Sequence, residues 1–304
     1  MTDRRLRPLL TLPLALVALS TLVACGESKP PAARLAAEPG RIDLPWPGFA
    51  EVDLELEPLA ELPAGSEPLL FVHLLDEPGS VVRTFDQPLP APWIPGRPQS
   101  WTVRLYQSAL AEPLAPGEYL LSAGLYLEDG ERFALETDGE AISRLEYRIA
   151  AVGVPPPGEK MPAARFSEHW LPPQPGVDRQ VLARRALRGG AAGTIQFGPI
   201  EGAGRLYLSL VVPDGSAERS RLELLDGGSQ PKVRIGTSCG GGQPEVTGTG
   251  RIDVDLDLPS AGSPRICDVV IEPNFQVTSL DSAEPTSVVL EVLAWGPAAD
   301  AEAR

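Results

Sequence analysis

The side chains able to do nucleophilic, redox or metal chemistry are few in this chain. It has three cysteines, Cys25, Cys239 and Cys267, and two histidines, His73 and His169. Neither a Cys-x-x-Cys pair nor a His-Glu-x-x-His motif is present, and these are the spacings typical of redox, zinc and metalloprotease sites. We therefore expect no catalytic residue, no metal site and no cofactor, and we expect the protein not to be an enzyme.

Two further polar patterns have structural explanations. His73 and Asp76 lie three residues apart, which in a strand places them on opposite faces and makes no simple dyad. Asp253, Asp255 and Asp257 alternate along a predicted strand, so neighbouring carboxylates lie about 7 Å apart on one face. That spacing is too wide for one calcium ion without loop ligands, and a solvated strand face is the better interpretation.

The pair His169 and Trp170, in FSEHWLPP, is the candidate ligand-binding site of the folded body. An exposed indole can stack on a sugar ring. A tryptophan at the edge of a domain is more often part of the packing, and this alternative stays open at the level of sequence.

The first 24 residues have the features of an export signal. A basic start at residues 4–7 precedes an apolar stretch, Leu9–Ala24, which is shorter than the roughly 20 apolar residues of a membrane-spanning helix. An uncleaved N-terminal anchor and an ordinary signal peptide are the alternatives.

The signal ends in Leu22-Val23-Ala24-Cys25-Gly26, which resembles the lipobox of bacterial lipoproteins. The resemblance implies lipidation of Cys25, cleavage before it and acylation of the new N-terminus, so that a lipid bilayer is the first partner. Two or more acyl chains hold a protein firmly on a membrane. Because Gly26 rather than Asp follows the cysteine, the resemblance favours the outer membrane of the bacterial cell envelope.

With Cys25 assigned to lipid, Cys239 and Cys267 remain as an even pair. Exported chains meet an oxidising compartment, where a disulfide is the simplest interpretation. Such a bridge would contribute roughly 3–4 kcal/mol. Two unpaired thiols that never meet are the alternative.

The rest of the sequence predicts an all-β protein of two β-sandwich domains. Apolar and polar residues alternate in short runs separated by Gly- and Pro-rich turns, the pattern of half-buried strands. We expect a lipidated tether over 25–40, a first sandwich over 41–150, a Pro-rich linker over 151–164, a second sandwich over 165–297 and a tail over 298–304. Residues 178–190 fit either a short helix or an Arg-rich edge strand.

The net charge of −15 excludes one class of partner. A surface this acidic repels the phosphates of nucleic acids, so no nucleic acid is expected as a ligand.

The sequence pattern of the first sandwich resembles that of the immunoglobulin-like accessory modules of bacterial membrane glycosyltransferases and other envelope proteins. The positions that match are Phe71, His73, Leu75, Asp76, Gly79, Asp86, Trp93, Gly96, Pro116, Gly117, Tyr119, Gly124, Leu125 and Tyr126. The second sandwich is loosely similar to jelly-roll-like modules of such proteins. The resemblance implies accessory β-sandwiches with no catalytic residue.

These observations together predict a membrane-anchored envelope lipoprotein with a non-catalytic binding or scaffolding role. Its ligand would be a glycan or another envelope protein. The alternative is a glycan-directed enzyme, or an accessory subunit of envelope polysaccharide assembly. A glycan ligand requires exposed aromatic side chains on one sheet face, whereas an enzyme requires a concave pocket with converging titratable groups.

Overall fold

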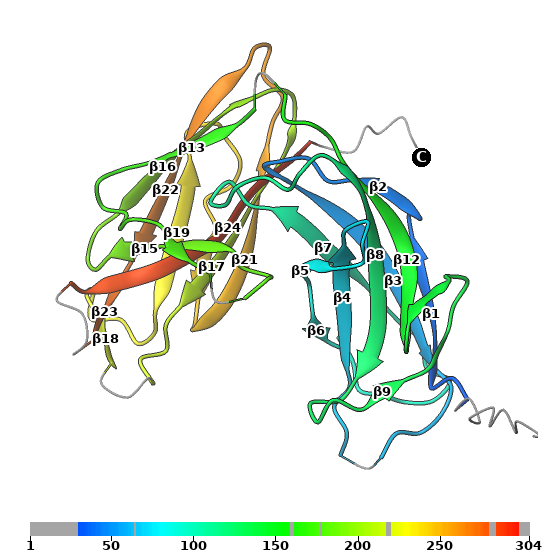
Figure 1. The fold of residues 1–304 in the computed structure, drawn as a ribbon. Coiled ribbons are helices and arrows are strands. Elements are labelled where there is room, and N and C mark those ends of the chain that lie inside the picture. Colours follow the sequence, from blue (N-terminus) through cyan, green and yellow to red (C-terminus); the bar gives the residue numbers. More distant parts are fainter. Residues whose placement is uncertain are drawn as a thin grey trace, which may run out of the picture. The chain divides into compact units, whose positions relative to one another are not determined.

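The computed structural model describes residues 30–63, 65–158, 161–176, 178–216, 220–279 and 284–297. Within these ranges every regular element is a strand, so the predicted all-β class is confirmed. No helix in the described ranges is long and apolar enough to span a bilayer. Figure 1 shows strands grouped into β-sandwiches.

Twelve strands precede the Pro-rich segment and twelve follow it. The first set is β1 (Ala33–Glu38), β2 (Arg41–Asp43), β3 (Gly48–Pro58), β4 (Leu69–Leu75), β5 (Val81–Thr84), β6 (Gln87–Pro88), β7 (Gln99–Gln107), β8 (Gly117–Tyr126), β9 (Arg132–Phe133), β10 (Leu135–Glu136), β11 (Ala141–Ser143) and β12 (Glu146–Val154). The second set is β13 (Ala163–Phe166), β14 (Gln174–Pro175), β15 (Ala183–Arg188), β16 (Gly193–Ile200), β17 (Gly204–Val212), β18 (Ser220–Leu224), β19 (Lys232–Thr237), β20 (Glu245–Thr247), β21 (Gly250–Leu258), β22 (Arg265–Pro273), β23 (Phe275–Ser279) and β24 (Thr286–Pro297).

The first sandwich packs strands β1, β3 and β7 against a sheet in the order β11-β12-β8-β4-β5. The alternation along β3 explains its placement, because Val52, Leu54 and Leu56 are buried while Asp53 and Glu55 are exposed. Facing residues of the other sheet, such as Leu70, Val72 and Leu121, complete the core.

The second sandwich packs β17, β21, β24 and β15 against a sheet in the order β13-β16-β22-β19-β20. Its core joins the inward side chains of β17 and β21 to those of β16 and β22, including Leu208, Val254, Phe197 and Ile271. Along β21 the aspartates face outward, as the alternation predicts.

One sheet is shared by both sandwiches. Strand β24 ends beside β3 in a parallel pairing of Trp295 with Gly48, which links the two halves into an 11-stranded sheet. The amide of Ala109 also donates to the carbonyl of Leu293 at 2.8 Å. The sandwiches therefore belong to one compact unit that begins at Pro31.

Two predicted boundaries are wrong. The tether was expected to reach residue 40, but Ala33–Glu38 forms β1 and pairs with β3 along its length. Its composition of Ala, Arg and Glu hides the alternation, although Ala33 and Leu35 are fully buried. The Pro-rich linker is shorter than 151–164, because β12 continues to Val154 and β13 begins at Ala163.

The segment 178–190 adopts the strand alternative. Residues Ala183–Arg188 form β15, which pairs antiparallel with β24. Tertiary pairing decides this, since the backbone of β15 pairs with the long strand β24, and such context overrides a local helix preference.

Residues that carry the resemblance of the first sandwich have packing roles. Gly124 lies under the ring of Phe71, where an added Cβ would approach a ring carbon to 2.2 Å. The ring of Phe71 also stacks on that of His73 at 4.6 Å between centroids. Gly79 and Gly96 occupy turns at φ of 85° and 74°, which favour glycine.

Candidate functional site

A charged cavity of about 370 Å³ lies where the two sandwiches meet. Its volume falls within the roughly 300–1,000 Å³ of small-ligand sites. The wall residues come from both halves of the chain: Glu51, Phe85, Asp86, Gln87, Thr102, Val103, Arg104, Tyr106, Gln180, Tyr207, Arg251, Asp253 and Asp255.

Strand alternation explains why the polar side chains of this cavity point into it. On β7, Val103 and Leu105 enter the first core, so Arg104 faces the opposite way. On β17, Leu206 and Leu208 enter the second core and Tyr207 faces outward. The outward faces of the two sandwiches therefore meet and supply the walls.

Arg104 bridges the two sandwiches in a bidentate ion pair. Its two terminal nitrogens each donate to a different carboxylate oxygen of Asp255 at 2.9 Å, and Nη2 also donates to Glu51 at 2.7 Å. Arg205 donates to the second oxygen of Glu51 at 2.6 Å. The guanidinium of Arg104 also lies 4.3 Å from the ring centroid of Tyr207, within cation–π range.

A second arginine and a tyrosine fix the other wall. Arg251 donates to Glu291, a carboxylate that is 6% exposed, at 2.6 Å. The hydroxyl of Tyr106 donates to the carbonyl of Gln180 at 3.2 Å, which holds the loop before β15 against the first sandwich. The cavity wall is thus set by contacts between segments far apart in sequence.

The surroundings shift the pKa values of three groups on the cavity wall, Glu51, Tyr106 and Tyr207. Burial alone would raise the pKa of Glu51, but hydrogen bonds and charge from Arg205 and Arg104 outweigh it and the pKa is lowered. Burial raises the pKa of Tyr106 and of Tyr207, so both phenols stay neutral. Each of these shifts moves the group away from pH 7.

Carboxylates outnumber guanidinium groups on the cavity wall. Glu51, Asp86, Asp253 and Asp255 face Arg104 and Arg251. The arrangement can hold a polar ligand, and its electrostatics favour one with a positively charged group.

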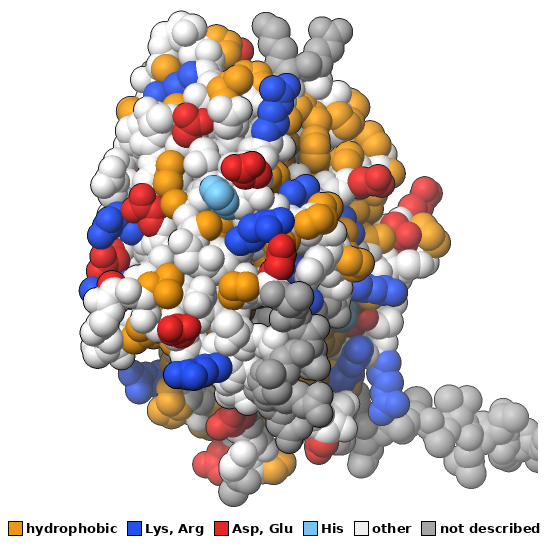
Figure 2. All heavy atoms as spheres, turned by 90° about the vertical axis from the view of Figure 1, so that its left-hand side faces the viewer, with side chains coloured by type: hydrophobic (Ala, Val, Ile, Leu, Met, Phe, Trp, Pro, Cys, Tyr) orange, Lys and Arg blue, Asp and Glu red, His pale blue; other side chains and the backbone are white. Residues whose placement is uncertain are grey.

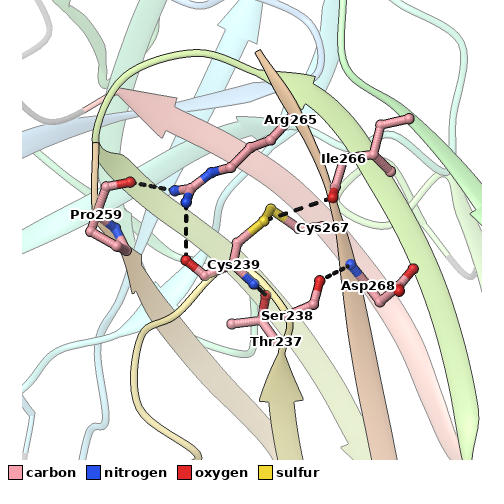
Figure 3. Close-up of a disulfide and its surroundings, with 8 residues drawn as sticks. All are labelled: Thr237, Ser238, Cys239, Pro259, Arg265, Ile266, Cys267 and Asp268. Carbon is pink, nitrogen blue, oxygen red and sulfur yellow. Dashed lines mark hydrogen bonds between the residues drawn. A yellow bond between two sulfur atoms is a disulfide. The ribbon is translucent and has the colours of Figure 1, made fainter. Parts of the chain in front are cut away.

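The predicted disulfide between Cys239 and Cys267 is present, with the two Cα atoms 5.3 Å apart. Figure 3 shows how its surroundings join the strand ends: Arg265 donates to the carbonyls of Cys239, at 3.1 Å, and Pro259. The amide of Asp268 donates a hydrogen bond to the hydroxyl oxygen of Ser238 at 2.9 Å. The disulfide therefore links the segment that follows β19 covalently to β22.

The structure does not present Trp170 as a ligand platform. Its side chain is 4% exposed and packs edge-on against Phe166 at 5.6 Å. Gly193 lies so close that an added Cβ would come within 2.7 Å of the indole nitrogen. Trp170 thus belongs to the second core, while its neighbour His169 is exposed. Neither residue lines the cavity.

His73 lies in a cluster that its own sequence neighbourhood did not indicate. Its Nε2 is 3.5 Å from Asp86 and its Nδ1 is 3.7 Å from Glu146, both on other segments, whereas Asp76 is not its partner. The hydroxyl of Ser122 donates to Glu146 at 2.7 Å rather than to the imidazole. The cluster therefore lacks the serine–histidine contact of a nucleophilic triad.

Cys25, the predicted lipidation site, lies outside the described residues. Among the residues that are described, no group of three or more His, Cys, Asp or Glu side chains is placed to hold a metal ion. Asp255, one of the three alternating aspartates, is instead engaged by Arg104. On the face in Figure 2, acidic and basic side chains are intermixed with no large field of one sign.

Comparison with known proteins identifies no family. No family model matches the chain, and no curated protein matches it. Among solved structures, a Bacteroides uniformis β-glucuronidase aligns with 86% of this chain and 30% of its own at 9% identity and a TM-score of 0.24. The native conformation of E. coli α-2-macroglobulin aligns with 88% of this chain and 14% of its own at 12% identity and a TM-score of 0.24.

Another similar structure is CBD12 from CALX1.2, at 10% identity and a TM-score of 0.20, covering 82% of this chain and 83% of that one. This chain thus spans less than a third of the first two structures. At such scores these similarities carry no functional argument.

Proposed function

We propose that the protein is a lipid-anchored component of the bacterial cell envelope with a non-catalytic binding role, and that the cavity between the sandwiches is its binding site. The anchor rests on the Leu22–Gly26 motif and its cysteine. The finer resemblance to immunoglobulin-like and jelly-roll-like envelope modules remains part of this proposal.

The binding role is supported by the charged side chains that converge on the cavity wall from both halves of the chain. An acid–base catalyst works best with a pKa near the operating pH. The pKa shifts of Glu51, Tyr106 and Tyr207 go the other way, away from neutral pH. The carboxylates of the wall outnumber its guanidinium groups, and this excess suits recognition of a positively charged group.

The choice between a glycan and a protein ligand follows from the aromatic side chains. Every Trp, Tyr and Phe of the chain lies in the described ranges; none is fully exposed, and Trp46, Trp93 and Trp101 are half-buried. The lack of a fully exposed aromatic side chain in the described ranges favours a protein ligand over a glycan. We assign an envelope protein as the partner, presenting a basic side chain to the carboxylates.

The anchor is tested by replacing Cys25 with Ala. The variant is expected to leave the membrane fraction and to lose the acyl mass from its N-terminal peptide. Unchanged membrane association together with unchanged mass would show that Cys25 is not lipidated.

The cavity is tested with short blocked peptides that differ in one side chain, acetyl-Gly-Arg-Gly-amide and acetyl-Gly-Glu-Gly-amide. The Arg peptide at millimolar concentration is expected to raise the melting temperature more than the Glu peptide. Asp253→Asn should remove the difference, whereas Asp257→Asn, on the same strand but outside the cavity wall, should keep it. Equal responses of the two variants would contradict the assignment of the cavity.

A further inference from the structure

The point where the folded body begins is fixed by hydrogen bonds to two other segments. The amide of Ala32 donates to the carbonyl of Ala134 at 2.8 Å, and the carbonyl of Ala32 accepts from Leu59 at 2.8 Å and from Ala60 at 3.2 Å. Cys25 precedes Ala32 by seven residues. At roughly 3.5 Å per extended residue, these span at most about 25 Å.

An apolar surface lies directly beside this point. The indole nitrogen of Trp93 donates to the carbonyl of Ala60 at 2.8 Å, which fastens the loop 88–96 to the residues that bind Ala32. Leu59 and Ile94 on these two loops are 37% and 42% exposed. The loop 88–96 contains four prolines and no charged side chain.

A shallow cavity of about 550 Å³ continues the same surface and is lined in large part by prolines and by Trp93. Two of the large hydrophobic side chains that are exposed among the described residues, Leu59 and Ile94, thus lie together at one end of the first sandwich. We call the surface formed by Leu59, Trp93, Ile94 and the prolines of 88–96 the anchor-side surface.

We propose that the anchor-side surface rests on the headgroup region of the bilayer that holds the lipidated Cys25. This inference rests on the proposed lipid anchor. The short reach from Cys25 to Ala32 makes this the part of the folded body tied nearest to the membrane. Tryptophan is enriched at membrane interfaces, where its ring meets the apolar boundary and its N–H a polar group.

The charged side chains around the anchor-side surface determine which lipid headgroup charge it tolerates. Glu67 and Glu128 line the same shallow cavity, and both are exposed. Arg97 follows the loop and is exposed as well. The acidic groups repel anionic headgroups, so the surface fits a zwitterionic bilayer and should be displaced as anionic lipid is added.

The test uses the full lipidated chain in phosphatidylcholine vesicles. A polarity-sensitive fluorophore is attached to Ile94→Cys or, as the matched control, to Leu225→Cys, an exposed position of the second sandwich (46%). We expect a blue-shifted emission and quenching by headgroup spin-labelled lipid at position 94 only. Both effects should weaken with increasing phosphatidylglycerol.

Equal quenching at the two positions would overturn the inference. So would the same blue shift in an Ile94→Cys, Cys25→Ala chain without vesicles, because a second copy would then cover the surface. The acyl mass on Cys25 is measured in each sample. Its absence contradicts the anchor, whereas its presence with an unquenched position 94 contradicts only the membrane contact.

Discussion

The disulfide gives the most quantitative expectation. Cys239 and Cys267 are separated by 28 residues, for which the chain-entropy relation gives about 3.6 kcal/mol at 25 °C. Cys267 is fully buried and Cys239 is 9% exposed, so replacing both with Ala also removes packed sulfur atoms. We expect the double Ala variant to lose roughly 3–5 kcal/mol of unfolding free energy.

Urea unfolding measures this loss, followed by the fluorescence of the buried tryptophans of the second sandwich, Trp170 and Trp295. Both arms carry Cys25→Ala, so that a thiol count reports only the pair. The m-value should rise in the uncrosslinked chain, because its unfolded state exposes more surface. A loss below about 1 kcal/mol, or two free thiols in the unfolded, unreduced parent, would refute the reasoning.

Two further variants test the packing and the charged cavity. Gly124→Ala should destabilise the protein by about 1–3 kcal/mol, because the new methyl group meets the ring of Phe71; thermal unfolding should show no such loss for Gly262→Ala, where nothing lies within 4 Å. The lowered pKa of Glu51 in the folded protein stabilises the fold at any pH above the unfolded pKa of about 4.3. This stabilisation is lost as the pH falls through the lowered folded pKa. Glu51→Gln should remove it. The difference from the parent should therefore shrink below about pH 4.5 in urea titrations. A pH-independent difference, or an equal effect of Glu55→Gln, would contradict the ion-pair origin.

Local patterns were enough to assign the class of fold and the faces of the strands. Alternation along β3 and β21 predicted which side chains enter the core, since successive residues of a strand point to opposite faces whatever the strand pairs with. Counting cysteines after assigning Cys25 was enough to pair Cys239 with Cys267.

The sequence by itself could not place β1 or the cavity. β1 is a strand because it pairs with β3 and buries Ala33 and Leu35 in the first core, a choice made by tertiary contact over a weak local preference. Arg104 and Asp255 stand 151 residues apart, and nothing local marks them as partners.

In the sequence, polar residues on the outward face of a strand have the same pattern whether that face contacts water or another sheet. Asp253 and Asp255 were predicted to lie on a solvated face, and their outward direction is correct. That this face meets the outward face of β7, with Arg104 between, follows from β24 joining β3. Composition and alternation therefore determined the two sandwiches, whereas the shared sheet decided which charges converge, because only the pairing of distant strands brings them within hydrogen-bond reach.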